Sequence, residues 1–249
     1  MNLALAAALS APGLAIGSFL NVVAARVPLR RSLFRPGSAC MSCGAAIAPR
    51  DNIPVLSYLL LRGRCRSCGV RISPRYVAVE LITALLVVAC GLRFGATAHA
   101  AVAAGFCIVL VVIAAIDLEH RIVPNRIVLP AAAVALLVQI AREPSIEWPL
   151  AAVGASLFLF VAAIVYPRGM GMGDVKLALL LGAVLGRDVT VGLMIGFLSA
   201  LVPAAVLFAT KGARARHMGI PFAPFLALGA IVALLAGPGL LDWYLGLAR

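Results

Sequence analysis

Long apolar runs constrain the fold of this chain more than any other feature. A helix needs about 20 apolar residues to span the hydrocarbon core of a bilayer. Eight runs approach or exceed this length, the sixth being short for a span: residues 3–25, 76–94, 99–117, 123–141, 148–166, 174–187, 189–209 and 222–247. Because 63% of the residues are hydrophobic, more than a soluble core of this size requires, we predict an all-α polytopic membrane protein with about eight transmembrane helices.

The basic residues indicate how these helices are oriented. With eight alternating spans, one side carries 17 of the 21 Lys and Arg residues, in segments 26–75, 118–126, 167–176 and 210–221. The positive-inside rule makes that side cytoplasmic and places both termini outside. The first run has no basic segment before it, so we expect a retained first span rather than a cleaved signal peptide. The net charge of +12 therefore fits a topology facing anionic membrane lipid and favours no nucleic-acid partner.

Residues 26–75 form the one stretch that is long enough to fold outside the bilayer. The pattern C-x-S-C-G-x-x-I-x-P-R occurs twice in it, at residues 40–50 and 65–75. We therefore expect three segments: a first transmembrane helix over 1–25, a small cytoplasmic zinc-binding region over 26–75, and a transmembrane domain over 76–249.

Each copy of the repeat contains a C-x-x-C pair, and two such pairs complete a tetrahedral shell of four thiolates for structural zinc. The predicted metal ligands are Cys40, Cys43, Cys65 and Cys68. Gly44 and Gly69 follow the pairs, where positive φ lets backbone N–H groups point at sulfur. A disulfide or redox pair is the alternative, but disulfides rarely persist in the cytoplasm. The other two cysteines, Cys90 and Cys107, fall inside apolar runs and are interpreted as packing residues.

Two acidic residues lie where a membrane protein least tolerates charge. Asp117 closes the third run, and Asp174 opens the sixth behind a string of Gly and Met residues at 169–173. Pro124 disfavours helix at Val123, so we expect the third helix to stop or kink just past Asp117. A carboxylate at this depth is a functional-site hypothesis by default. The alternatives are an interfacial carboxylate held by Arg121 and Arg126, and a helix N-cap at Asp174.

Two carboxylates on separate helices suit acid/base chemistry if they converge on one water. Like charges in a low-dielectric site do not both ionise easily, so the pair would share one proton. One carboxylate would then draw a proton from water while the other hydrogen-bonds the scissile carbonyl. The sequence separation of Asp117 and Asp174 does not fix their distance, so their convergence is a prediction.

Several motifs lie along nearly the whole chain, beginning with Gly17-Ser18-Phe19-Leu20-Asn21 and the two cysteine pairs. Later ones are Ile116-Asp117 through Pro124, Gly171-Met172-Gly173-Asp174-Val175-Lys176 and Pro221-Phe222-Ala223-Pro224-Phe225. Together they resemble the type IV prepilin peptidases, a family of GxGD-type intramembrane aspartic peptidases. Two positions depart mildly from the commoner family pattern, namely Met41, where proline is usual, and Ala223, where glycine is usual.

The resemblance implies that the chain cleaves the leaders of prepilins and of type II secretion pseudopilins at the cytoplasmic face of the bacterial inner membrane. It also implies methylation of the new N-terminus with S-adenosylmethionine, because the cysteine-bearing region belongs to bifunctional members. Asp117 and Asp174 fall on the family's two catalytic aspartates. Pilus or secretion machinery would be a further partner. No local motif identifies the residues that bind S-adenosylmethionine.

Four residues are candidates for supporting roles: Glu80, Gly171, Gly173 and Lys176. Glu80 would lie by the active site, contribute to methyl transfer, or pair with Arg75. Lys176 would tune Asp174, orient substrate, or extend to the interface. Two other functions stay open, an ion-coupled transporter that uses Asp117 and Asp174, and a zinc-anchored assembly factor without catalysis. A transporter site is expected near the bilayer midplane, whereas both aspartates lie toward one face, and the sequence shows no two matching halves.

Overall fold

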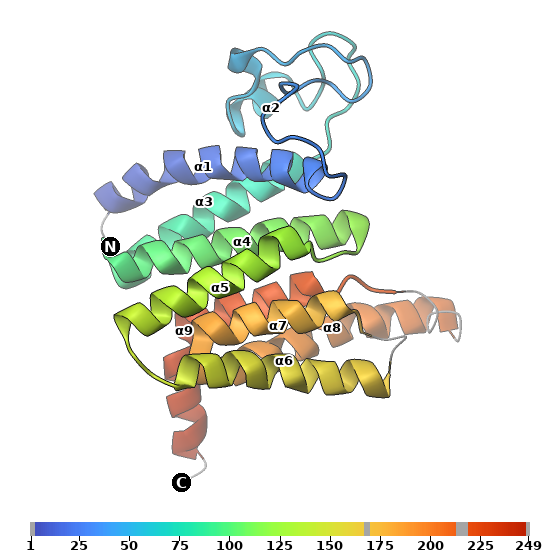
Figure 1. The fold of residues 1–249 in the computed structure, drawn as a ribbon. Helices are drawn as coiled ribbons and strands as arrows, with labels where there is room; N and C mark the ends of the chain where they lie inside the picture. The colour runs from blue at the N-terminus through green and yellow to red at the C-terminus, as the bar shows by residue number, and fades with distance from the viewer. Residues whose placement is uncertain (1–2, 167–169, 213–218, 248–249) are drawn as a thin grey trace. The chain divides into compact units, whose positions relative to one another are not determined.

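The computed structural model of the chain describes residues 3–166, 170–212 and 219–247, with side chains of the last helix described to Ala236. Within these residues the secondary structure is helical, with isolated β-bridges in place of strands. The helices of the first part are α1 (Leu3–Arg26), η1 (Pro49–Asp51), α2 (Leu56–Leu60), α3 (Arg75–Phe94) and α4 (Ala98–His120). They are followed by α5 (Asn125–Arg142), α6 (Glu147–Val165), α7 (Met172–Leu185), η2 (Gly186–Asp188), α8 (Val189–Lys211) and α9 (Ala223–Leu247) (Figure 1).

Each of the eight predicted spans is a helix, so the prediction of an all-α protein is confirmed. Six segments of the described chain are long and apolar enough to cross a membrane. The count differs from eight for two reasons. First, α7 and α8 lie in one continuous segment of 40 residues, Met172–Lys211, which counts once. Second, the described part of α9, Ala223–Ala236, is too short to be counted as a span. The chain is therefore a multi-pass membrane protein.

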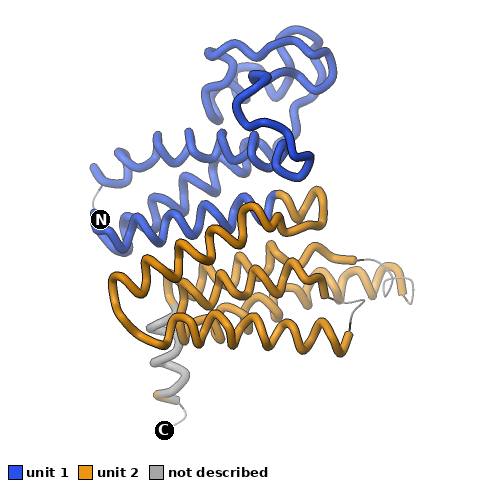
Figure 2. Tube along the Cα trace, viewed as in Figure 1, with its two compact units in different colours: residues 1–115 blue, residues 116–249 orange. Residues whose placement is uncertain are grey.

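The chain divides into two compact units, residues 1–115 and residues 116–249, and the division falls within α4 (Figure 2). The expected division at residues 25 and 75 stays a prediction. Four residues from the sequence argument, Arg168, Gly169, Arg214 and Arg216, lie outside the described residues.

Close contact between α1 and α3 organises the first unit. Gly13 and Gly17 lie one turn apart on α1, and Cβ atoms built on them would come within 2.7 Å of Cα of Ala84 and 2.6 Å of Cα of Glu80 on α3. Such small residues at a spacing of four let two membrane helices approach backbone to backbone. Farther along α1, the Asn21 side chain donates a hydrogen bond of 3.0 Å to the carbonyl oxygen of Tyr76. The two helices therefore run antiparallel.

The second unit is built around α7, whose residues from Asp174 to Leu185 are almost all buried. This 14-residue helix packs chiefly against α6 and α5. Gly182 makes the approach to α6 possible, because a Cβ at that position would overlap the backbone of Ala151 and Ala152. Neighbouring helices cover the sides of α7. The first turn, which bears Asp174, is the part of α7 that lines a pocket.

Candidate active site and metal centre

Asp117 lies in the last turn of α4. The helix ends at His120, three residues beyond Asp117, because Arg121 adopts a left-handed conformation with φ of 53°. Pro124 then precedes α5, which starts at Asn125. The predicted helix end between Asp117 and Pro124 is therefore confirmed.

The carboxylate of Asp117 is bound by a distant part of the chain. Its Oδ2 accepts a hydrogen bond of 3.1 Å from the backbone N–H of Ala223, the first residue of α9. The side chain is 6% exposed. Among the described residues, neither Arg121 nor Arg126 forms an ion pair with this carboxylate, although Arg121 lies at the same pocket.

Asp174 occupies the third position of α7. Its backbone N–H donates to the carbonyl oxygen of Gly171 at 3.1 Å, and its Oδ2 accepts from the N–H of Gly171 at 3.3 Å. The bond to Oδ2 is the Asp174 half of a capping box, and the N-cap is Gly171, which has no side chain, rather than Asp174. The capping interpretation of Asp174 therefore holds in part. It leaves the second carboxylate oxygen, Oδ1, outside the cap.

Asp117 and Asp174 line one pocket that offers about 220 Å³ to water. The remaining lining residues are Arg121, Ile122, Val123, Asn125, Gly171, Gly173 and Lys176. They come from the end of α4, the loop before α5 and the first turns of α7. Both aspartates thus lie on the wall of one pocket, as the sequence led us to expect, and the pocket has room for water.

Close contact between the two walls of the pocket sets its width. A Cβ built on Gly173 would lie 2.9 Å from Cβ of Val123 in the loop after α4. Real Cβ atoms do not approach that closely, so any larger residue at position 173 would push the loop away from α7. Glycine is thus required at this position by the approach of the loop that follows Asp117.

A polar contact joins α7 to the start of α5. Nζ of Lys176 donates a hydrogen bond of 3.0 Å to Oδ1 of Asn125 at the start of α5. Lys176 therefore links α7 to α5 at the rim of the pocket. Sequence reasoning gave no contact to Asn125, Val123 or the N–H of Ala223. The sequence indicated only that alanine at position 223 replaces the glycine usual in the family, and it suggested no chemical role for Ala223.

Glu80 belongs to the first unit. It is 7% exposed, and its Oε2 accepts a short hydrogen bond of 2.7 Å from the backbone N–H of Val55. Val55 has φ of 61° and ψ of −51°, and the N–H of Leu56 bonds back to the carbonyl oxygen of Pro54 at 2.6 Å. This is a γ-turn with positive φ, a strained conformation for a β-branched residue. The carboxylate of Glu80 stabilises that turn.

The four predicted metal ligands come together in the region between α1 and α3. The sulfur atoms of Cys40, Cys43, Cys65 and Cys68 all lie within 4.8 Å of one another. The two repeats fold alike: Gly44 and Gly69 share φ of 71°, and each N–H bonds to the carbonyl oxygen of the first cysteine of its pair at 2.9 Å. Backbone N–H groups of Cys43 and Ser42 lower the pKa of the Cys40 thiol to about 6. The positive φ expected at both glycines is therefore confirmed.

The cluster has the dimensions of a zinc site. Tetrahedral zinc with Zn–S bonds of about 2.3 Å places its sulfur ligands about 3.8 Å apart. Sγ of Cys40 lies 3.9 Å from Sγ of Cys68, nearly twice the length of a disulfide bond. All four cysteines are free thiols, so the structure has no disulfide bond among them. The four sulfur atoms are therefore compatible with zinc binding.

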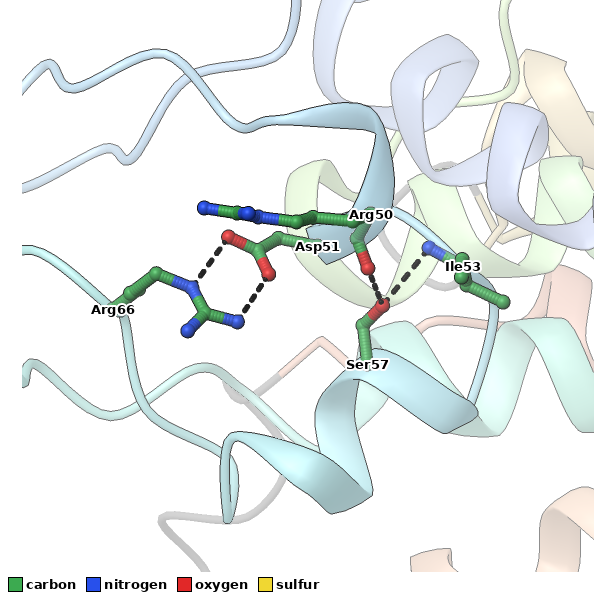
Figure 3. Close-up of polar contacts among 5 residues, drawn as sticks. All are labelled: Arg50, Asp51, Ile53, Ser57 and Arg66. Atoms are coloured by element: carbon green, nitrogen blue, oxygen red, sulfur yellow. Dashed lines mark hydrogen bonds and ion pairs between the residues drawn. The ribbon is translucent and has the colours of Figure 1, made fainter.

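The second repeat is attached to the rest of the region by side-chain contacts (Figure 3). Nε and Nη2 of Arg66 donate to the two carboxylate oxygens of Asp51 at 2.8 and 2.6 Å. Oγ of Ser57 donates to the carbonyl oxygen of Arg50 and accepts from the N–H of Ile53, both at 3.0 Å. Arg66, which follows Cys65, is thereby held to η1, and η1 is held to α2.

Comparison with known families covers most of the chain. Residues 12–94 match the Bacterial Peptidase A24 N-terminal domain, and residues 104–210 match the Type IV leader peptidase family. The first match contains the cysteine cluster, and the second contains both pocket aspartates. No solved structure matches the chain significantly.

Several curated proteins are similar over much of their length. A protein of Bacillus subtilis is 38% identical over 95% of this chain and 96% of its own length. One from Myxococcus xanthus is 41% identical over 82% of this chain and 64% of its own length. One from Burkholderia pseudomallei is 34% identical over 90% of this chain and 83% of its own. Each is named prepilin leader peptidase/N-methyltransferase.

Proposed function

The chain belongs to the type IV leader peptidase family, and from this premise we propose that it is a membrane-embedded aspartic endopeptidase that also acts as an N-methyltransferase. Its substrates would be type IV prepilins and type II secretion pseudopilins, whose leader peptides it removes. The observation that carries the proposal is that Asp117 and Asp174 line one pocket that admits water. The transporter alternative has no support among the relatives.

In the peptidase step, Asp117 and Asp174 share one proton. The charged carboxylate accepts a proton from the water that attacks the scissile carbonyl carbon, and the neutral one donates a hydrogen bond to the carbonyl oxygen. The carbon–nitrogen bond then breaks, and the leaving amine takes up a proton. The N–H of Ala223 and the N–H of Gly171 fix one oxygen of each carboxylate, so each can present its other oxygen to the substrate.

Gly171, Gly173 and Lys176 would support this chemistry. Gly171 caps α7 and orients Asp174. Gly173 lets the loop after Asp117 close on α7, and Lys176 holds α7 to α5 through Asn125. Glu80 would support the region between α1 and α3 by binding the N–H of Val55.

The methylation step would use S-adenosylmethionine as methyl donor. When bound, it would supply the methyl group to the new N-terminal amine, with cleavage of its carbon–sulfur bond and loss of a proton from the amine. The names of the relatives, each a prepilin leader peptidase/N-methyltransferase, support this second activity. Structural zinc held by Cys40, Cys43, Cys65 and Cys68 would fix the fold of residues 26–75, since four thiolates leave no coordination position open for catalysis.

The enzyme would lie in the bacterial inner membrane with its pocket toward the cytoplasm. The support is the sequence distribution of Arg and Lys, which gather on the side that carries both aspartates. The enzyme would bind prepilins, and contact the pilus or secretion machinery, on that side of the membrane.

Substitution of each pocket aspartate tests the proposal. Purified Asp117→Asn and Asp174→Asn variants, given a prepilin, should each lose leader cleavage by about 10²- to 10⁴-fold, the usual contribution of general acid/base catalysis. Glu119→Gln is the matched control, because it removes the same charge two residues from Asp117 at an exposed site. Substantial cleavage by either well-folded asparagine variant would refute the aspartic mechanism.

A further inference from the structure

The short helix α2 carries its apolar side chains outward. Leu56, Leu59 and Leu60 lie at spacings of three and four, which places them on one face of the helix. They are 50%, 64% and 72% exposed, although α2 lies in the connection between α1 and α3 rather than in a predicted span. A face of this kind on a water-exposed helix usually marks an interaction surface.

The opposite side of α2 is polar and firmly attached. Ser57 is buried and bonds to the backbone of Arg50 and Ile53 (Figure 3). The ring of Tyr58 packs against Gly63, where an added Cβ would lie 2.9 Å from it. These contacts fix the orientation of the helix, so the three leucines cannot turn inward without breaking them.

The bond between Glu80 and Val55 sets the position of α2 relative to α3. Val55 directly precedes α2, and its N–H donates a hydrogen bond to Glu80. Glu80 lies five residues after Arg75, the first residue of the apolar helix α3. Five residues of α-helix correspond to about 7.5 Å of rise. The start of α2 is therefore held beside the second turn of a membrane-spanning helix, at the depth of lipid headgroups.

The charge around α2 matches an anionic surface. Residues 26–75 contain ten arginines and a single acidic residue, Asp51, which Arg66 already binds. Arg62 and Arg64 are exposed and follow α2 directly. Exposed leucines next to exposed arginines are the composition of segments that lie in the interface of an anionic bilayer.

From these contacts we propose that α2 is an interfacial helix, which inserts Leu56, Leu59 and Leu60 between the headgroups of anionic lipids. Arg62 and Arg64 bind lipid phosphates beside it, and Glu80 is a positioning residue that holds α2 at this depth through Val55. The lipid surface thereby supports the metal-binding region on one side. The proposal rests on the membrane fold and is independent of the peptidase function.

Tryptophan fluorescence in nanodiscs with one chain per disc tests the proposal. A Leu60→Trp variant carries the α2 probe, and Met41→Trp carries the control probe at a site that is 87% exposed in the first cysteine repeat. The emission of the parent protein is subtracted from both. Lipids brominated near the headgroup end of the acyl chain should quench the α2 probe at least twofold more than the control probe when the discs contain phosphatidylglycerol. The difference should shrink in phosphatidylcholine and after Arg62→Gln with Arg64→Gln.

The positioning role of Glu80 predicts a further difference. Glu80→Ala, which removes the acceptor for the N–H of Val55, should reduce quenching of the α2 probe toward the value for the control probe. Glu80→Gln retains an acceptor oxygen and should preserve most of the quenching. Equal effects of the two variants would overturn the positioning role.

Three results would overturn the interfacial helix. The first is equal quenching of both probes by the brominated lipids. The second is an α2 probe that becomes protected from solvent only after a prepilin is added, so that the substrate covers the leucines. The third is an α2 probe that is protected only in discs with two chains, so that a second copy covers them. Should Leu60→Trp fail to fold, hydroxyl-radical labelling of the unmodified protein decides the question. Leu59 and Leu60 must then be labelled less in discs with phosphatidylglycerol than in detergent, and equal labelling contradicts the proposal.

Discussion

The backbone N–H of Ala223 donates a hydrogen bond of 3.1 Å to Oδ2 of Asp117, although 106 residues separate them in the sequence. The bond ties the start of α9 to the end of α4 and fixes one oxygen of a pocket carboxylate. A backbone donor is a dependable partner here, because it is held by the helix and has no side-chain freedom to lose. Hydrogen bonds to charged groups are also stronger than neutral ones.

Removal of this donor should lower cleavage. Ala223→Pro deletes the N–H at the first position of α9, where proline fits a helix. Loss of a hydrogen bond to a charged group costs about 1.5–3 kcal/mol, so kcat should fall about 10- to 100-fold. Ala223→Gly keeps the N–H and should retain most of the activity. An initial-rate assay on a prepilin peptide measures both, and equal rates for the two variants would contradict a role for this bond.

Gly173→Ala should lower activity without unfolding the chain. The added Cβ would meet Val123 at 2.9 Å and displace the loop between Asp117 and Asn125 from α7. Because a shift of about 1 Å in a catalytic geometry can cost about 100-fold, we expect kcat to fall about 10- to 100-fold. Gly154→Ala in α6 is the control, since nothing lies within 4 Å of its added Cβ. Thermal melting should be similar for both, and normal cleavage by Gly173→Ala would show that this contact does not matter.

Metal content should depend on the cysteine cluster alone. Elemental analysis of purified protein should give about one zinc per chain, and Cys65→Ser or Cys68→Ser should reduce it to near zero, because a three-thiolate shell binds far more weakly. Cys107→Ala changes a buried cysteine in α4 and should leave the metal content unchanged. Loss of metal should make residues 26–75 sensitive to proteolysis. Full zinc in Cys65→Ser, or iron in place of zinc, would contradict the assignment.

The Arg66–Asp51 pair should slow the release of metal. Bonds from Arg66 hold the pKa of Asp51 below its ordinary value. The folded-state pKa is thus depressed, so the pair stabilises the region above about pH 4 and is lost as the pH falls through the lowered pKa. At pH 7 a chelator should therefore remove zinc about two- to fivefold faster from Arg66→Gln, but not from Arg71→Gln. The double variant Asp51→Arg with Arg66→Asp should restore the slow removal of zinc. Fast removal from the double variant would show that the ion pair does not control metal release.

The parts that sequence predicted well are those with local causes. Apolar runs located the helices, and the duplicated C-x-S-C-G pattern located a cluster whose glycines adopt the expected positive φ. Pro124 indicated the end of α4, but the left-handed Arg121 that completes it has no sequence signal. That conformation ends the helix at His120.

The parts that sequence could not supply depend on distant backbone groups. The donor to Asp117 is the N–H of Ala223, and a backbone N–H looks the same in every residue type except proline. Glu80 was expected to lie near the active site, to contribute to methyl transfer or to pair with Arg75, and no sequence pattern indicated its bond to the N–H of a strained Val55. Both contacts follow from tertiary packing, which no local pattern records.

Mass spectrometry of a prepilin incubated with the protein and S-adenosylmethionine tests the central claim most directly. The unmodified protein should yield a pilin that has lost its leader and gained one methyl group at the new N-terminus. Asp117→Asn and Asp174→Asn should leave the prepilin intact, yet each should still methylate a pilin supplied without its leader. Removal of the leader by either asparagine variant, or an intact leader with the unmodified protein, would contradict the assignment of Asp117 and Asp174 as the peptidase pair.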